Sequence, residues 1–259
     1  MSIESAYDFS GKVVIITGGS RGLGHAMALA FARAGANLAI ASRKIESCEE
    51  TVREVHALGS DGTAHAFNVG RWSDCDRLCE EVYARWHRAD VLINNAGMSP
   101  LAPSLLETSE DLFDKVLSVN LKGPFRLSAL FGSRMAASDG GSIINISSTA
   151  SIRPSNRFAC YAAAKAGLNA ITTAYAHEYG PKVRVNAIVA GPFHTDVSKG
   201  WSRTEQFTRR AREVFPMQRA GEPDEIVGAA LYLAGPAASF TTGAILTVDG
   251  GESQPKSSH

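Results

Sequence analysis

Apolar and polar positions follow two alternating patterns along the chain. Short runs of β-branched and other apolar residues recur, and longer stretches with helical spacing of apolar residues lie between them. A continuous apolar strand fits a sheet that is buried on both faces, and helices between such strands are typical of parallel pairing. The runs expected as strands are 13–17, 38–42, 64–69, 91–95, 143–147, 183–189 and 245–248.

The stretches between these runs complete the predicted architecture. Because crossover connections are right-handed, the alternation predicts an α/β, Rossmann-like, doubly wound parallel sheet with helices on both faces. No internal repeat or linker divides the chain, so residues 1–259 are predicted to form a single domain. The clearest helical stretches are 23–33, 109–136, 158–179 and 223–234, and a charged stretch, 44–58, follows the second expected strand.

Two segments interrupt the alternation. Residues 195–216 are polar and rich in arginine. They follow the end of a strand, where open α/β sheets bind ligands, so they predict a lid-like insertion. Residues 252–259 are polar and predict a frayed tail.

Composition narrows the class of protein. Of the 259 residues, 44% are hydrophobic and 20% are charged, as in ordinary globular proteins. Lysine plus arginine and aspartate plus glutamate both number 26, so neither nucleic acid nor an anionic membrane is expected as a partner. The chain has no run of about 18 apolar residues, so no membrane span is expected. The N-terminal residues also lack the apolar core of a signal peptide.

The four cysteines do not resemble a disulfide framework in a chain of this length. Cys75 and Cys79 are four residues apart on an expected helix, but no second pair of Cys or His at metal-binding spacing accompanies them. We therefore expect no metal site, and a reduced, cytoplasmic protein.

A glycine-rich loop follows the first expected strand and opens the first helix. Glycine permits a tight turn, and its missing Cβ lets backbone N–H groups approach a pyrophosphate at the helix N-terminus. The same glycines would also fit a strand-to-helix turn that needs them only for its backbone geometry and binds nothing. The position of this loop in the first βα unit favours a nucleotide site. The residues of this candidate site are Gly18, Ser20, Arg21, Gly22, Leu23 and Gly24.

The end of the second expected strand indicates which dinucleotide binds. NAD sites usually carry an acid there for the ribose 2′-OH, whereas NADP sites use a cation for the 2′-phosphate. Here Ser42 and Arg43 occupy the strand end, no acid precedes Glu46, and Arg21 projects toward the same region from the glycine loop. NADP(H) is therefore favoured over NAD(H), although both arginines also fit solvated surface charges.

Tyr161 and Lys165 are four residues apart on an expected helix and share a face. A free tyrosine, with a pKa of about 10, is a weak acid for proton transfer near neutral pH. A lysine charge about 4 Å away, at an effective dielectric near ~20, favours the phenolate by about 4 kcal/mol, or about three pKa units, as an upper value. Taken alone, the pair also fits two side chains on a solvated helix face.

Two further polar residues accompany the pair. Ser148 ends an expected strand thirteen residues before Tyr161, where a hydroxyl can hold a substrate oxygen. Asn120 lies inside the expected 109–136 helix. Asparagine is a poor helix former, so Asn120 indicates a polar role, a helix irregularity or a satisfied buried amide.

With these motifs together, residues 11–251 resemble the short-chain dehydrogenase/reductase family, including its members that reduce 3-oxoacyl groups on acyl carrier protein. The resemblance implies a seven-stranded Rossmann sheet and an oxidoreductase that interconverts a ketone or aldehyde and an alcohol. The segments that carry it are 17–24, 94–97, Asn120, Ser148, Tyr161 with Lys165, 242–244 and 248–251.

The resemblance also implies residue roles. Tyr161 is the acid/base, Ser148 orients the substrate oxygen, Lys165 binds the nicotinamide ribose and lowers the tyrosine pKa, and Asn120 holds a water in a proton relay. The further cofactor residues that it implies are Asn68, Val69, Asn95, Ala96, Gly97, Gly191 and Thr195.

The chain departs from the family pattern at two places. Many relatives have Asp-Val where this chain has Asn68 and Val69, and we expect adenine contact to be retained because asparagine also forms hydrogen bonds. Many have Pro-Gly after the sixth strand, where this chain has Gly191 followed by Pro192, so the loop near the nicotinamide is expected to differ in shape.

The substrate is expected to be a small carbonyl or alcohol compound bound between the ends of the strands and the lid. Arginines at positions 153, 203, 209, 210 and 212 suit an anionic substrate such as an acyl thioester carrier, but Glu205 and Glu213 among them favour a solvated surface. The residues expected to line the pocket are Met98, Ser99, Ile152, Arg153, Pro154, Asn156, Phe193, His194 and Trp201.

The sequence allows more than one oligomeric state and more than one function. The resemblance implies a homo-oligomer, a dimer or a tetramer, packed through the 109–136 and 158–179 helices and the last strand. Besides an enzyme, the sequence fits a catalytically silent dinucleotide-binding regulator or an interaction protein of the same fold.

Overall fold

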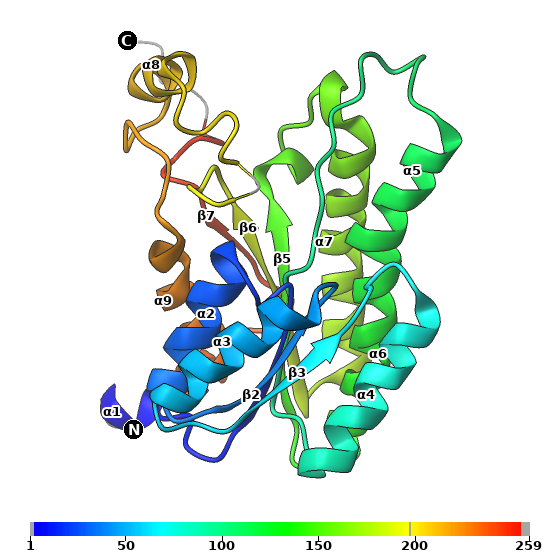
Figure 1. Cartoon of the computed structure of the whole chain (residues 1–259), viewed down its shortest axis with the longest axis vertical. Helices are drawn as coiled ribbons and strands as arrows, with labels where there is room; N and C mark the ends of the chain where they lie inside the picture. Colours follow the sequence, from blue (N-terminus) through cyan, green and yellow to red (C-terminus); the bar gives the residue numbers. More distant parts are fainter. Residues whose placement is uncertain (1–2, 197, 255–259) are drawn as a thin grey trace.

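The chain forms a seven-stranded parallel sheet between two layers of helices (Figure 1). The structure is a computed structural model that describes residues 3–196 and 198–254. The strand order is β3-β2-β1-β4-β5-β6-β7, and every neighbouring pair is parallel, which confirms the predicted fold. The strands are β1 (Val13–Thr17), β2 (Asn37–Ser42), β3 (Gly62–Ala66), β4 (Val91–Asn94), β5 (Gly141–Ser148), β6 (Val183–Ala190) and β7 (Ile245–Val248).

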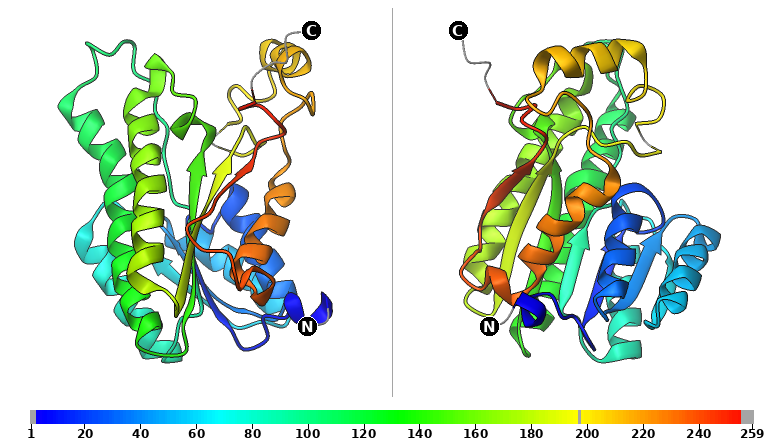
Figure 2. Two further views of the ribbon diagram at one scale, coloured as in Figure 1. Left: turned by 180° about the vertical axis from the view of Figure 1, so that it is seen from behind. Right: turned by 90° about the vertical axis from the view of Figure 1, so that its left-hand side faces the viewer.

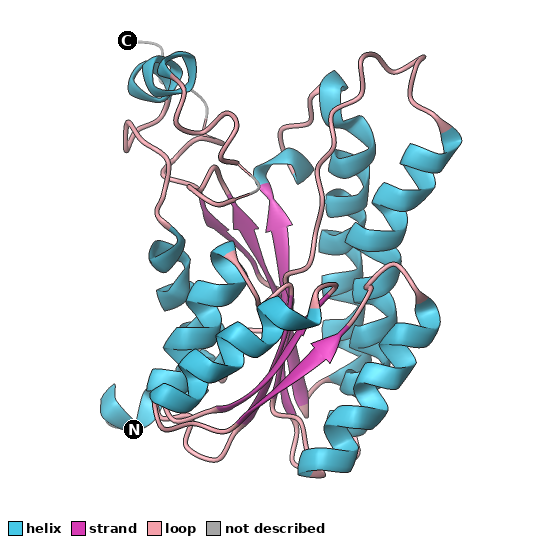
Figure 3. Cartoon of the chain, in the orientation of Figure 1, coloured by secondary structure: helices cyan, strands magenta, loops and turns pink. Residues whose placement is uncertain are grey.

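Helices cover both faces of the sheet (Figures 2 and 3), and alternate residues of the inner strands belong to two different apolar cores. Val14 and Ile16 of β1 join one apolar core, while Val13 and Ile15 join the other. Burial on both faces is the reason that the strands are continuous apolar runs in the sequence. The layer on the Val14 side contains α2 (Gly22–Arg33), α3 (Ile45–Ala57) and α9 (Val227–Ala234), and the opposite layer contains α4 (Trp72–Trp86), α6 (Gly123–Ala136) and α7 (Ala159–Tyr179).

β3 lies earlier in the chain than the expected 64–69. It pairs with β2 from Gly62 to Ala66, and the chain then turns away from the sheet. The side chain of Asn68 accepts a hydrogen bond from the Gly70 N–H at 3.1 Å, which closes a turn that a continuing strand could not contain. The expected strand was therefore placed too late because an apolar turn residue, the buried Phe67, extended the apolar run.

The helix expected at 109–136 is interrupted. It consists of α5 (Glu110–Leu117), a π-helical turn η1 (Ser118–Lys122) and α6. Pro124 at the start of α6 has no N–H to donate into the preceding turn, and a side chain at Gly123 would overlap the Val69 carbonyl oxygen. The predicted long helical stretch is therefore present, and these two features account for the π-helical turn within it.

The 195–216 segment contains a helix, α8 (Glu205–Val214), at the edge of the molecule beyond the carboxyl ends of the strands (Figure 1). The Thr204 hydroxyl caps it by accepting from the Phe207 N–H at 3.2 Å. The rings of Trp201, Phe207 and Phe215 pack edge to face, with centroids 5.2 Å and 5.9 Å apart along the series. This segment thus has a small apolar cluster of its own.

The start of the polar tail contacts the rest of the chain. The Ser253 N–H donates to Asp249 Oδ2 at 2.8 Å, and the Glu252 carboxylate lies 3.5 Å from the Arg210 guanidinium. The polar sequence gave no sign of these side-chain contacts. Residues 255–259 of the expected tail lie outside the described residues. No helix in the described residues is long and apolar enough to cross a membrane.

Candidate active site

The carboxyl ends of β1, β4, β5 and β6 lie at one edge of the sheet, as parallel pairing requires. At that edge α7 places Tyr161 beside the end of β5, where the Ser148 side chain is near enough to the phenol to lower its pKa. One turn further along α7, Lys165 Nζ lies 5.7 Å from the centre of the Tyr161 ring and donates to the Ile146 carbonyl oxygen at 2.7 Å. A hydroxyl, a phenol and an amine therefore meet at the end of one strand.

Burial controls the proton affinities of this pair. It raises the pKa of Tyr161, and the neighbouring Ser148 side chain opposes that rise. It lowers the pKa of Lys165 to about 8, because an ammonium group loses its hydration there. The sequence expectation that Lys165 leaves Tyr161 with a lowered pKa is wrong for the protein's own residues, since it omitted the desolvation of the phenol.

Asn120 occupies the π-helical turn, so it is both the irregularity and the satisfied amide that the sequence allowed. It is fully buried. Its Nδ2 donates to the carbonyl oxygens of Met98 and Val116, both at 2.9 Å, and its Oδ1 accepts from the Met98 N–H at 3.2 Å.

Gly97 lies between Asn120 and the amine of Lys165. A Cβ added to Gly97 would lie 3.0 Å from Asn120 Oδ1 and 3.7 Å from Lys165 Nζ. The missing side chain therefore lets the loop after β4 pass between these two groups, and all four residues of the expected tetrad lie around the ends of β4 and β5.

The glycine loop forms a cradle at the N-terminus of α2. Gly18 and Gly22 have φ of +66° and +55°, which side chains rarely adopt, and a Cβ on Gly24 would overlap the Gly18 carbonyl oxygen. The residue before α2, Arg21, makes no side-chain cap. The first N–H groups of the helix are therefore not satisfied by a capping side chain, and the loop fits the pyrophosphate of a dinucleotide.

A threonine and an asparagine fasten this cradle to β4. Thr17 Oγ1 accepts from the N–H groups of Asn95 and Ala96, both at 3.1 Å. Asn95 Nδ2 in turn donates to the carbonyl oxygens of Thr17 and Gly18 at 2.9 Å and 3.1 Å. Asn95 and Ala96, expected as cofactor residues, thus set the shape of the glycine loop.

The end of β2 brings together the residues expected to choose the dinucleotide. The Ser20 hydroxyl donates to Ser42 Oγ at 3.0 Å. Arg21 and Arg43 are both exposed, and neither forms an ion pair with the described part of the chain. Two unpaired guanidinium groups beside two hydroxyls suit a phosphate monoester.

The loop after β6 closes against the cradle from the other side. A Cβ on Gly22 would lie 3.3 Å from the Thr195 side chain, and one on Gly191 would lie 2.6 Å from the Asp249 Cα. Asn68 and Val69 lie after β3, with Val69 buried and Asn68 partly exposed. Leu23, in the first turn of α2, packs against the core on its inner side. The expected cofactor residues therefore lie along the loops at the carboxyl ends of the strands.

Comparison with known proteins identifies the family. Residues 18–253 match the family model described as enoyl-(acyl carrier protein) reductase, and curated oxidoreductases align along nearly the whole chain. The chain is a short-chain dehydrogenase/reductase.

Individual relatives of this short-chain dehydrogenase/reductase differ in substrate and cofactor. A 3-oxoacyl-(acyl-carrier-protein) reductase from Thermotoga maritima is 34% identical, covering 93% of this chain and 97% of the relative. The structure of a gluconate 5-dehydrogenase from Burkholderia cenocepacia J2315 in complex with NADP and tartrate has a TM-score of 0.92 and 30% identity, covering 98% of this chain and 100% of its own. The structure of a 7α-hydroxysteroid dehydrogenase complexed with NADH also has a TM-score of 0.92 and 30% identity, and the match covers 97% of this chain and 98% of the dehydrogenase.

The residues expected to line the substrate pocket differ in their contacts and exposure. Arg153, expected in the pocket wall, donates to the Glu252 carbonyl oxygen at 3.3 Å. His194 contacts Ser202 Oγ through Nδ1 at 3.1 Å and lies 4.0 Å from Glu222, so it fastens the loop before α8. Of the other expected wall residues, Phe193 is buried, while Ile152 and Trp201 are 49% and 46% exposed.

The remaining lid arginines face outward. Arg203, Arg209 and Arg212 line a hollow on α8 together with Glu205 and Glu213. This mixture of charges agrees with a solvated helix face.

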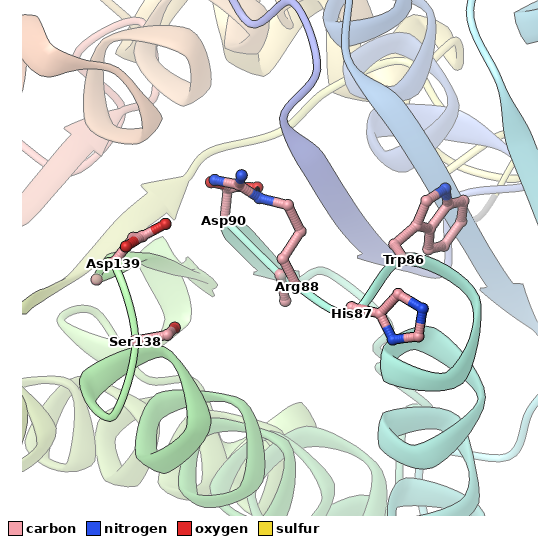
Figure 4. A pocket seen from close by; sticks show the side chains of 8 residues that line it. Trp86, His87, Arg88, Asp90, Ser138 and Asp139 are labelled. Atoms are coloured by element: carbon pink, nitrogen blue, oxygen red, sulfur yellow. Dashed lines mark hydrogen bonds and ion pairs between the residues drawn. The ribbon is translucent and has the colours of Figure 1, made fainter.

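A second hollow, of about 240 Å³, lies at the opposite edge of the sheet, next to the residues that precede β4 and β5 (Figure 4). There Arg88 donates to Asp90 at 2.6 Å, and Lys12 lies 3.2 Å from the same carboxylate. Burial raises the pKa of Asp90, but the bonds from Arg88, the Val13 N–H and Lys12 outweigh it and leave the pKa below its usual value. Lys12, Arg88 and Asp90 are thus paired with one another at the strand starts.

Sequence reasoning missed two groups of residues at the site. Thr17 orders the glycine loop, yet a threonine at a strand end carries no distinctive signal. Ser151 and Asn169 bond to each other next to Ser148. A signal for Asn169 was present, because it is a poor helix former placed two turns after Tyr161 on the same helix face.

Proposed function

We propose that this protein is an NADP(H)-dependent oxidoreductase that interconverts a ketone or aldehyde and the corresponding alcohol, with Tyr161 as acid/base. The observation that carries the proposal is the place of the Lys165 amine, which is buried at the end of β5 and lies 5.7 Å from the centre of the Tyr161 ring, with Ser148 next to the phenol. When bound, the nicotinamide supplies or accepts the hydride.

The chain's own residues then handle the oxygen and its proton. Ser148 holds the substrate oxygen, and Tyr161 donates a proton to it in reduction or removes one in oxidation. Lys165 in its ammonium form stabilises the phenolate that remains after donation, and its position suits the nicotinamide ribose. Asn120 holds the Met98 backbone, and we assign it the proton relay next to Lys165.

The preference for NADP(H) rests on Arg21 and Arg43. Both are exposed and unpaired within the described residues, and no acidic side chain occupies the end of β2. The similar proteins do not decide the matter, because one was solved with NADP and another with NADH.

The test is the variant Tyr161→Phe, assayed by NADPH absorbance with a panel of ketones and aldehydes. We expect turnover to fall by at least about 1,000-fold, because the proton donor is removed, while the dissociation constant of NADPH stays within about twofold. A variant with full turnover would refute the role of Tyr161. A wild-type protein that binds NADPH tightly but reduces no member of the panel would favour a silent regulator.

We also infer a homo-oligomer in a reducing compartment such as the cytoplasm. In support, Phe125 of α6 is 42% exposed and lies 6.4 Å from the exposed Trp72 ring, and Ile245 is 39% exposed on the edge strand β7. All four cysteines are free thiols. Sedimentation of the wild type distinguishes a dimer or tetramer from a monomer.

A further inference from the structure

Two consecutive hydrogen bonds tie the middle of α7 to the backbone of Ser148. Asn169 Nδ2 donates to Ser151 Oγ at 2.9 Å, and Ser151 Oγ donates to the Ser148 carbonyl oxygen at 2.6 Å. Ser151 lies in η2 (Thr149–Ser151), the short turn that follows β5. Because Ser151 Oγ accepts the amide proton, its own proton points to the carbonyl, and the two bonds polarise each other.

Asn169 lies on the same face of α7 as the two proposed catalytic residues of that helix. Tyr161, Lys165 and Asn169 are each four residues apart and occupy one helix face. The first lies next to Ser148, the second donates to the Ile146 carbonyl oxygen and the third donates to Ser151. The second and third of these turns are therefore fastened to the end of β5 and to η2, and the first two carry proposed catalytic groups.

Asn169 is an unfavourable choice for packing alone. Its Oδ1 is buried and has no hydrogen-bond partner, which costs free energy, and asparagine lowers the stability of a helix interior. A leucine, which is branched at the same carbon, would avoid both penalties. The amide donor to Ser151 is the contact that an apolar side chain could not supply.

We propose that Asn169 and Ser151 are positioning residues that hold Ser148 in register with Tyr161. The inference rests on the proposed function, because it concerns the placement of the serine in that reaction. The Ser148 hydroxyl also accepts from the Ala150 N–H at 3.2 Å, so its direction depends on the η2 turn. Ser151 fixes that turn at one end, and a shift of about 1 Å in a reacting group can lower a rate by about 100-fold.

The experiment compares Asn169→Leu and Ser151→Ala in the full chain. We expect each to lower kcat with NADPH by about 10-fold, with the NADPH dissociation constant within about twofold of wild type and the melting temperature of Asn169→Leu equal or higher. Ser151→Thr, which keeps the hydroxyl, should retain kcat within about threefold. Thr173→Ala is the matched control, because Thr173 is exposed one turn beyond Asn169 on α7.

Two readouts separate positioning from a merely structural role. The apparent pKa in the pH profile of kcat should rise in Asn169→Leu, because the neighbouring Ser148 side chain lowers the pKa of Tyr161, while Lys165, the charged group next to the ring, is unchanged. The double variant should be no slower than the slower single variant, since the two bonds act in series.

Unchanged kcat and an unchanged pH profile in Asn169→Leu would overturn the proposal, as would losses that simply follow the melting temperature. If the wild type shows no turnover at all, the proposed function fails instead. The positioning role is then judged by hydrogen exchange of the Ala150 N–H. About 10-fold faster exchange in Asn169→Leu than in wild type supports it, and equal exchange refutes it.

Discussion

The dinucleotide side and the substrate side of this molecule are held together in different ways. Around the glycine loop, backbone groups approach so closely that a Cβ on Gly24 would overlap a carbonyl oxygen, and Thr17 and Asn95 close the loop with reciprocal bonds. Around α8, the polar links to the rest of the chain include one ion pair, between Arg210 and Glu252. The first side is built for one shape of ligand, and the second is free to vary with the substrate.

The largest effect is expected from Gly24→Val, which disrupts the closely packed glycine loop on the dinucleotide side. Its side chain would displace the Gly18 backbone and the Asn95 amide, so we expect NADPH affinity to fall by more than about 100-fold and stability to fall by about 3 kcal/mol or more. Calorimetry and thermal melting measure both. Gly228→Ala is the control, because a Cβ there meets nothing within 4 Å and should stabilise α9 by up to about 1 kcal/mol.

The second-largest expected effect tests the preference for NADPH over NADH on the dinucleotide side. Arg43→Asp replaces a cation with an anion, so we expect the KM for NADPH to rise by about 100-fold and the KM for NADH to change by less than about threefold. Steady-state kinetics with both dinucleotides measure it. Arg33→Asp, an exposed change of equal charge at the far end of α2, should affect neither, and equal losses for both dinucleotides in Arg43→Asp would contradict the NADP(H) assignment.

Lys165 allows a test in which stability rather than turnover is measured. Its pKa is about 8 in the folded chain and about 10.5 when unfolded, so at pH 7 the buried ammonium destabilises the fold by about 3 kcal/mol. Lys165→Met removes this penalty and loses one hydrogen bond worth about 1 kcal/mol, so we expect a net gain of about 2 kcal/mol.

The pH dependence of that gain has a definite sign. Between pH 8 and about 10.5 the unfolded wild type binds a proton that the folded form has lost, so wild-type stability rises with pH in this window. The gain of Lys165→Met measured by urea unfolding should therefore be full below pH 8 and shrink as pH rises toward 10.5. A gain that does not depend on pH would contradict the buried charge.

The smallest effect is expected on the substrate side. Glu252→Ala removes the contact with Arg210, whose side chain is 60% exposed, and exposed ion pairs contribute less than about 1 kcal/mol. We expect little change in melting temperature or NADPH affinity, and a change of about two- to threefold in the substrate KM. Arg210→Gln should reproduce this result, and a large loss of NADPH affinity would show that the two sides are coupled.

Errors in the sequence reasoning came from tertiary contacts rather than from local pattern. β3 was placed too late because Phe67 is buried in the turn after the strand. The helix break at Asn120 was flagged by a poor helix former, but its position depends on the contact between Gly123 and Val69. The direction of the Tyr161 pKa was wrong because burial, which the spacing of Tyr161 and Lys165 does not reveal, dominates it.

The sequence by itself determined the parallel sheet, the glycine cradle and the shared face of Tyr161 and Lys165. These features depend on the period of apolar positions, on backbone sterics and on residues a few positions apart, all of which are local. Only the tertiary structure decided that Asn169 reaches Ser148 through Ser151, that burial sets the proton affinities of the pair, and that Glu252 joins Arg210. Each of these requires the desolvation or close approach of groups far apart in the chain, and no local spacing specifies that.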